Sequence, residues 1–194
     1  MSRLKIQIDF DGICYHWEKT ARYMLREVLP NSPYKNDPSL ERESTHWNYI
    51  EHNVAPEHWK WLWSEGVKLG LFRHGHLWKG TIQAVRRLAE LGDVIVVTHR
   101  PRSAVLDTLA CLAYHNMPIS GLHILTDQQK KSSVVTDGFF LDDKPENCID
   151  VNDTGADVWL MDRPWNRHCN WPQRCHSWHE FVQYVWAAKT AGVA

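Results

Sequence analysis

The sequence predicts an α/β protein in which a parallel sheet carries helices on both faces and a small helical cap is inserted after the first strand. Short strand-like segments alternate with helical segments from Gly80 onward, an order typical of a parallel sheet with crossover helices. Acidic or polar residues follow three of the predicted strands, counting the first strand near the N-terminus. The segment from Cys14 to about Trp78 is polar and aromatic and holds four prolines, which favours loops and helices over strands. The predicted sheet is therefore Rossmann-like, with one insertion.

The first strand is predicted at Leu4–Asp9, where apolar residues alternate with polar ones. An Asp-x-Asp-Gly turn ends it. Residues 15–78 form the predicted cap, with helices expected around Glu18–Val28 and His58–Val67. Residues 1–14 and 79–194 together form the predicted core.

Hydrophobic periodicity assigns the other core elements. Apolar residues recur at helical spacing in some segments, and short apolar or β-branched runs mark further strands. Ser177 and Glu180 have the spacing of a capping box, which opens the last helix. The predicted helices are Ile82–Leu91, Ser103–Tyr114 and Ser177–Ala188, and the predicted strands are Asp93–Thr98, Leu122–Leu125, Phe139–Asp142 and Val158–Met161.

The composition excludes several classes of protein. The 194 residues include 22 basic and 23 acidic side chains, for a net charge of −1, so the chain has no overall field to capture a long nucleic acid. No apolar run approaches the roughly 20 residues of a membrane helix. Met1 leads almost directly into the first strand, so no signal peptide is predicted. The five cysteines form no C-x-x-C pair, which indicates a reduced, cytoplasmic protein. Most of the 11 tryptophans are expected in the core, with a few facing a ligand.

Polar side chains follow three of the predicted strands. Because the carboxyl ends of parallel strands lie at one edge of the sheet, we expect these side chains to meet there. Carboxylates this close repel one another, so a cation is expected, and Mg²⁺ suits carboxylate and phosphate oxygens. The residues are Asp9 and Asp11 after the first strand, Thr98, His99 and Arg100 after the second, and Asp142 and Asp143 after the fourth.

Each motif also has a structural interpretation. Asp-x-Asp-Gly is a common turn sequence, an Asp pair often lies in a solvated loop, and a threonine after a strand often caps a helix. Taken separately, these interpretations are the more probable ones. All three motifs at the ends of adjacent parallel strands favour a functional site.

The segments IDFDG, VVTHR, a following lysine and FLDD resemble the four motifs of the haloacid dehalogenase (HAD) superfamily of phosphotransferases. The resemblance extends from Ile6 to Asp143, and the predicted cap lies where these enzymes carry one after the first motif. GLFRHGHLWKGTIQAVRRLAELG, FLDDKPENC and LMDRPWNR are similar to segments of the 5′(3′)-deoxyribonucleotidases, which remove phosphate from deoxynucleoside monophosphates. Trp165 stands where those enzymes carry tyrosine, and His99 stands where they usually carry serine.

The resemblance implies a mechanism. Asp9 is expected to attack phosphorus and form an aspartyl-phosphate, and Asp11 to act as general acid and base. Mg²⁺ is expected to bind Asp9, the backbone carbonyl of Asp11 and Asp142. Asp143 is expected to support that shell or to act as a further ligand.

The resemblance also implies how the substrate is held. Thr98 and a lysine are expected to hold the phosphoryl oxygens, with Lys131 preferred over Lys130. His99 is expected to touch the substrate. Arg100 is expected either to grip the phosphate or to form a salt bridge. Phe72 is the first choice for stacking on the base, ahead of Trp63 and Trp78.

Several alternatives stay open at this point. The substrate is a deoxynucleoside 5′-monophosphate, another small phosphate ester or a nucleic-acid 3′ end, or else the chain is a non-catalytic nucleotide-binding homologue. The sequence leaves a homodimer open. A zinc site in the segment 168–179 is a further alternative, although its spacing matches no zinc template; its candidate ligands are Cys169, Cys175, His176 and His179.

Overall fold

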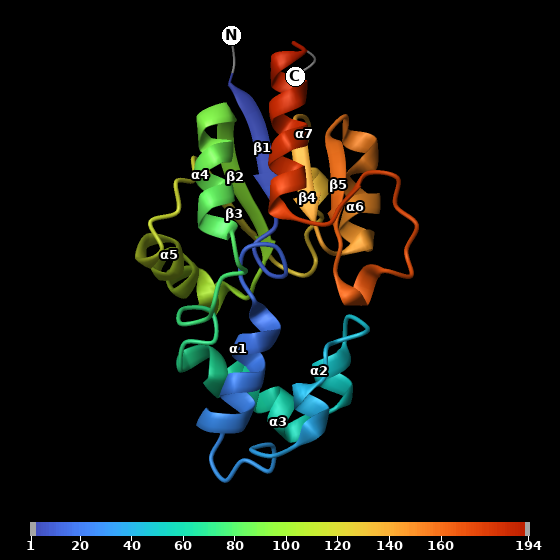
Figure 1. Ribbon diagram of the computed structural model, residues 1–194. Helices are drawn as coiled ribbons and strands as arrows, with labels where there is room; N and C mark the ends of the chain where they lie inside the picture. The colour runs from blue at the N-terminus through green and yellow to red at the C-terminus, as the bar shows by residue number, and fades with distance from the viewer. Residues whose placement is uncertain (1–2, 193–194) are drawn as a thin grey trace.

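The computed structural model describes residues 3–192 and contains a six-stranded sheet in which every pairing is parallel (Figure 1). The strand order is β3-β2-β1-β4-β5-β6. Strands β2 and β3 lie on one side of β1 and strands β4 to β6 on the other. The strand order therefore switches between β1 and β4, and this is the position where open α/β sheets bind ligands. The strands are β1 (Leu4–Ile8), β2 (Gly92–His99), β3 (Gly121–Leu125), β4 (Phe139–Asp142), β5 (Asp157–Met161) and β6 (Arg174–Cys175).

Helices cover both faces of the sheet. Side chains of α4 (Thr81–Leu91), α5 (Val105–Tyr114) and α7 (Trp178–Thr190) join the hydrophobic cluster on one face, and α6 (Pro145–Val151) packs on the other. In β2, β4 and β5, alternate residues belong to the two clusters, as the two-residue period of a strand requires. None of the helices in residues 3–192 is long and apolar enough to cross a membrane.

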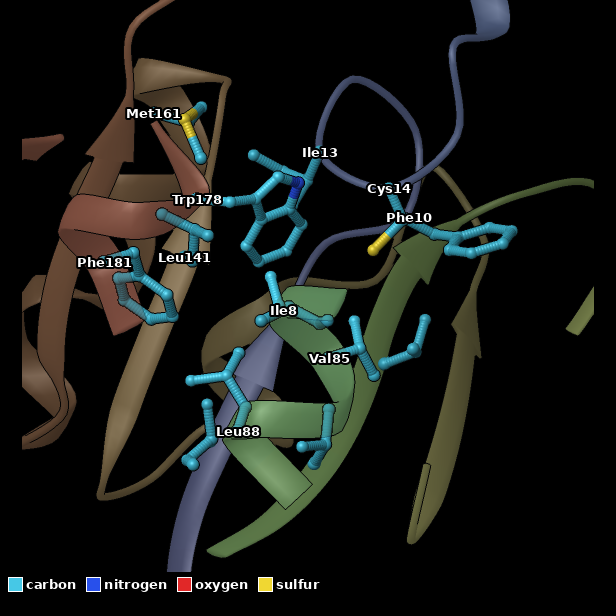
Figure 2. Packing of buried hydrophobic residues seen from close by; sticks show 14 of the residues in the cluster. Ile8, Phe10, Ile13, Cys14, Val85, Leu88, Leu141, Met161, Trp178 and Phe181 are labelled. Carbon is cyan, nitrogen blue, oxygen red and sulfur yellow. The ribbon is translucent and has the colours of Figure 1, made fainter. Parts of the chain in front are cut away.

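Helices α4 and α7 pack on one face of the central strands β1 and β4. Figure 2 shows Val85 and Leu88 of α4 close to Ile8, and Phe181 of α7 beside Leu141. Ile8, Val85, Leu88 and Phe181 are each fully buried. This packing holds the end of β1, and the Asp9 that follows it, in one place.

The residues between β1 and α4 form a second structural unit, which we call the helical lobe (residues 17–72). The lobe has a hydrophobic cluster of its own, including Leu25, Ile50 and Leu62. Figure 1 shows it beyond the carboxyl ends of the strands. Its elements are α1 (Trp17–Tyr23), α2 (Tyr49–His52), α3 (Pro56–Trp61), π-helical turns at Met24–Val28 and Leu62–Gly66, and a 3₁₀ turn at Pro38–Glu41.

Two neighbouring chain segments connect the lobe to the sheet. The backbone N–H of His16 donates to the carbonyl of His76 (2.8 Å), and that of Trp78 donates to Cys14 (2.9 Å). The rings of His16 and Trp78 stack at 3.7 Å between centroids, and the Arg163 guanidinium lies 4.2 Å from the centre of the indole ring. Two groups this close to one ring occupy opposite faces, so the indole is held between His16 and Arg163.

The predicted fold class is confirmed, and each predicted strand and helix begins and ends within two residues of the observed bounds. Three short elements were not predicted: α2, α6 and β6 have four, seven and two residues, too few for a period to show. The capping box is half correct. The Ser177 hydroxyl accepts from the Glu180 N–H, but the Glu180 carboxylate accepts from the N–H of His176.

The stacked connection predicts a pH dependence of stability. Burial, together with Lys19 and Arg163, lowers the pKa of His16 from 6.5 to about 4. The unfolded chain therefore protonates this imidazole at higher pH than the folded protein does, so acidification from about pH 6.5 to about pH 4 favours unfolding. Between these two pH values we expect the free energy of unfolding to fall by on the order of 1 kcal/mol more in wild type than in His16→Phe, because phenylalanine stacks on the indole but does not titrate. Urea unfolding across the interval measures this, and equal losses would contradict it.

Candidate active site

A cavity of about 730 Å³ lies between the carboxyl ends of the strands and the helical lobe. This volume is in the range of small-molecule sites, which are mostly apolar with a few converging polar groups. Asp9, Asp11, Thr98 and Asp143 line its sheet side. Its aromatic wall consists of Trp17, Trp47, Trp59, Trp63, Phe72, Trp78 and Trp165.

Three buried carboxylates converge on the sheet side of this cavity. Asp9 follows β1, Asp142 ends β4 and Asp143 follows it, and one carboxylate oxygen from each lies within 4.8 Å of the others. The Lys131 ammonium lies 2.8 Å from Asp9 Oδ1 and 2.7 Å from Asp142 Oδ2. The Lys130 side chain is 80% exposed and pairs with Asp150 instead. The structure therefore brings Lys131 rather than Lys130 to the carboxylates.

Neighbouring donors fix the orientation of Asp142. Its Oδ1 accepts from the backbone N–H of Lys144 (2.8 Å), and the Asn147 amide donates to both of its oxygens (3.2 and 3.1 Å). Because α6 begins at Pro145, its first turn carries Asn147 back over the acidic pair.

Asp143 is held from three sides. The Trp165 indole N–H donates to its Oδ2 (2.9 Å), and the Asn166 amide donates to its backbone carbonyl (2.7 Å). Gly12 has a φ of +79°, and a Cβ there would lie 2.2 Å from Asp143 Oδ2, so only glycine leaves room for this carboxylate. The Oδ1 atom is buried and has no hydrogen-bond partner in the described part of the chain.

The cluster holds more negative than positive groups. Burial, reinforced by the charges of Asp142 and Asp9, raises the pKa of Asp143 well above its ordinary value. Burial also raises the pKa of Asp142, although Lys131 opposes the shift. Burial disfavours the charged form of Lys131, but Asp142 and Asp9 outweigh it, and the pKa of this lysine is raised. One ammonium thus faces three carboxylates.

The donor set fits a divalent cation that prefers oxygen ligands. Three carboxylates lie close enough to share one ion, one buried oxygen has no partner, and a cation would remove the charge imbalance. The Asp11 carboxylate stands apart from this group, because both of its oxygens accept from Arg100 (2.8 and 2.6 Å). Residues 3–192 hold no second cluster of histidine, cysteine or carboxylate side chains of this kind, so the zinc alternative in the segment 168–179 is not supported.

The remaining residues that the sequence singled out have different positions. Thr98 is fully buried, lines the cavity, and its hydroxyl has no partner within the described residues. His99 lines the cavity and its Nε2 pairs with the Gln129 carbonyl (2.8 Å). Phe72 lines the cavity with Trp63 6.0 Å away between ring centroids.

The structure corrects the expectation that Arg100 binds phosphate. Its side chain is 0% exposed and does not line the cavity. Its three guanidinium nitrogens donate to Asp11 and Thr108. Of the two roles considered for Arg100, the structure shows the salt bridge, because the guanidinium is buried outside the cavity lining.

Sequence reasoning missed the contact between Trp165 and Asp143. The two residues are far apart in the chain and meet only through the pairing of β4 with β5 and the turn at Pro164–Asn166. The one available signal was the departure at Trp165 from the tyrosine of the resembling enzymes. It marked the position without indicating the partner.

The parallel sheet with its inserted helical lobe is a HAD-like α/β fold, and comparison with solved structures agrees. A HAD-like hydrolase of Streptococcus pneumoniae is similar over 94% of this chain and 98% of its own, with a TM-score of 0.65 and 11% identity. A putative HAD hydrolase of Bacillus subtilis is similar over 95% of this chain and 99% of its own, with a TM-score of 0.63 and 13% identity.

The sequence comparisons give the family. Residues 3–191 match the model of the family described as 5′ nucleotidase, deoxy (pyrimidine), cytosolic type C protein, and the chain belongs to this family. A nucleotidase of Clostridium acetobutylicum is 26% identical over 174 residues, which cover 86% of this chain and 84% of that protein. The protein is therefore a phosphatase of the 5′-nucleotidase type.

The lysine in the carboxylate cluster gives a test of the site's electrostatics. Lys131→Met removes the one ammonium among three buried carboxylates, and removing one partner of a buried pair costs about 3–5 kcal/mol. We expect a loss of this size in the free energy of urea unfolding at pH 7. Lys130→Met is the matched control, with a change within about 0.5 kcal/mol. Equal effects of the two variants would show that the cluster does not depend on Lys131.

Proposed function

We propose that the protein is a Mg²⁺-dependent nucleotidase that removes phosphate from deoxynucleoside 5′-monophosphates through a phosphorylated Asp9. The observation that carries the proposal is the buried group of Asp9, Asp142 and Asp143 beside Lys131. It lies in a cavity whose other wall is aromatic. The family description supports a deoxynucleotide substrate, and the Bacillus subtilis neighbour is described as bound to magnesium.

In the proposed first step, an Asp9 carboxylate oxygen forms a bond to phosphorus while the bond from phosphorus to the nucleoside 5′ oxygen breaks. Asp11 gives its proton to that leaving oxygen. In the second step, water attacks phosphorus, its proton passes to Asp11, and the bond to Asp9 breaks. Asp9, the Asp11 carbonyl, Asp142 and Asp143 would hold the Mg²⁺ ion, which would supply positive charge for the phosphate oxygens.

The phosphoryl oxygens need fixed donors on the sheet side of the cavity. We assign this role to the Thr98 hydroxyl and the Lys131 ammonium. The hydroxyl is supported by its burial without a partner in residues 3–192, and Lys131 by its contact with Asp9. His99, at the cavity edge, is assigned a contact with the substrate. Preorganised donors of this kind lower the barrier because they need no reorganisation during the reaction.

The nucleoside is assigned to the aromatic side of the cavity. Residues 15–78 act as the cap, and Phe72 and Trp63, which line this side of the cavity, are assigned to stacking on the base. Stacking of one base on an aromatic side chain contributes roughly 1–3 kcal/mol. The partner is therefore a small nucleotide, and the family's description as cytosolic supports a cytoplasmic location. A homodimer stays a prediction of the sequence.

The test is phosphate release from a panel of deoxy- and ribonucleoside monophosphates, with Mg²⁺ and with a chelator. We expect release that favours deoxynucleotides, stops with the chelator and falls at least about 10³-fold in Asp9→Asn, because the amide is not a nucleophile. Asp137→Asn is the matched control, since Asp137 pairs with Lys5 on the surface, away from the cavity, and we expect it to match wild type.

Three outcomes would contradict parts of the proposal. Phosphate release that continues with the chelator would contradict the metal requirement. Phosphate release that continues in Asp9→Asn would contradict the phosphorylated aspartate. Release from a general phosphate ester but from no nucleotide would leave the chemistry and remove the substrate assignment.

A further inference from the structure

Arg100 donates two hydrogen bonds to Asp11 from outside the cavity lining. Its Nε donates to Asp11 Oδ2 (2.8 Å) and its Nη2 to Asp11 Oδ1 (2.6 Å), which is the bidentate geometry that fixes a carboxylate most firmly. Asp11 lines the cavity with its side chain 20% exposed, whereas the Arg100 side chain is 0% exposed and lines no part of it.

The rest of the guanidinium is immobilised. Its Nη1 donates to the Thr108 hydroxyl (2.9 Å), which in turn donates to the Ala104 carbonyl (2.8 Å). Three aromatic rings surround its central carbon, Phe10 and Phe72 at 4.6 Å and Tyr15 at 4.9 Å to the ring centroids. A planar cation held this way has no freedom to turn toward a ligand.

Stability alone does not require such a pair. Removing an arginine and an aspartate from water costs several kcal/mol per ion, and apolar residues of similar volume often stabilise a protein as well or better. What the pair provides is a single orientation for a carboxylate at the edge of the cavity, and that orientation matters only if Asp11 has a directional task.

We propose that Arg100 is a positioning residue that fixes the Asp11 carboxylate for proton transfer and does not itself bind the substrate. The inference rests on the proposed function, because it needs Asp11 to give a proton to the leaving oxygen and to accept one from water. Proton transfer requires an Asp11 oxygen within hydrogen-bond distance of the leaving oxygen or the water. Arg100 sets that distance by fixing the position of the Asp11 carboxylate.

A double-mutant cycle tests the inference. Arg100→Met is combined with Asp11→Asn, and phosphate release is measured with a deoxynucleoside monophosphate and with 4-nitrophenyl phosphate, whose leaving group departs without a proton. We expect Arg100→Met alone to lower kcat on the nucleotide on the order of 10²-fold, with KM changed less than about threefold and a smaller loss on the aryl ester. In the Asp11→Asn background we expect less than about a twofold further loss, because a residue that acts through Asp11 has nothing left to position.

Arg73→Met is the matched control. Arg73 follows Phe72 in the chain and pairs with Asp107 (2.9 Å from Nε), so this variant also breaks an arginine–aspartate pair but does not touch Asp11. We expect its kcat within about twofold of wild type. Arg100→Lys covers the case in which Arg100→Met fails to fold, since a lysine keeps the charge without the bidentate geometry. It should show an intermediate loss that again disappears with Asp11→Asn.

Two results would overturn the inference while leaving the proposed function intact. A rise in KM with kcat retained would make Arg100 a substrate ligand. A loss that persists in the Asp11→Asn background would make its role structural. Full activity of Asp11→Asn itself would instead remove the proton-transfer role of Asp11 from the proposed function, and the inference with it.

Discussion

The site depends on one buried ammonium group. Lys131 lies within 2.8 Å of two carboxylates, with a third close by, and the elements around it keep the acidic groups together against their mutual repulsion. The Lys144 N–H and Asn147 orient Asp142, and Trp165 orients Asp143. Three carboxylates face one ammonium, and the negative charge that remains after Lys131 is counted is what suits the cluster to a divalent cation.

The parallel sheet brings the site residues together although they lie far apart in the chain. β1, β2 and β4 end at one edge because every pairing is parallel. Asp9 after β1, Thr98 and His99 at the end of β2, and Asp143 after β4 therefore reach the same cavity without a long loop. Glycine at position 12 is the accompanying local requirement, since its positive φ and missing Cβ admit Asp143. The helical lobe adds most of the aromatic wall, and the stack of His16, Trp78 and Arg163 ties the two connections of the lobe together.

The sequence was sufficient to predict elements with a regular apolar spacing and site residues that lie at the end of a strand. The strands and longer helices follow from apolar spacing, and Asp9, Thr98 and Asp142 follow from their places at strand ends. The sequence was insufficient where contacts between residues distant in the chain determine which side chain is buried or paired. Lys130 and Lys131 are adjacent, and only the packed fold shows which one is buried. The salt bridge of Arg100 and the Trp165 contact with Asp143 depend on three-dimensional proximity, which no spacing encodes.

The central claim is that Asp9 itself carries the phosphoryl group during turnover. Acid quenching of the enzyme during reaction with a deoxynucleoside monophosphate and Mg²⁺, followed by mass spectrometry of its peptides, tests this directly. The account predicts a phosphorylated peptide containing Asp9, absent from Asp9→Asn and from enzyme treated with a chelator. Rapid phosphate release with no phosphorylated Asp9 peptide at any quench time, under conditions that preserve acyl phosphates, would contradict it and indicate direct attack by water.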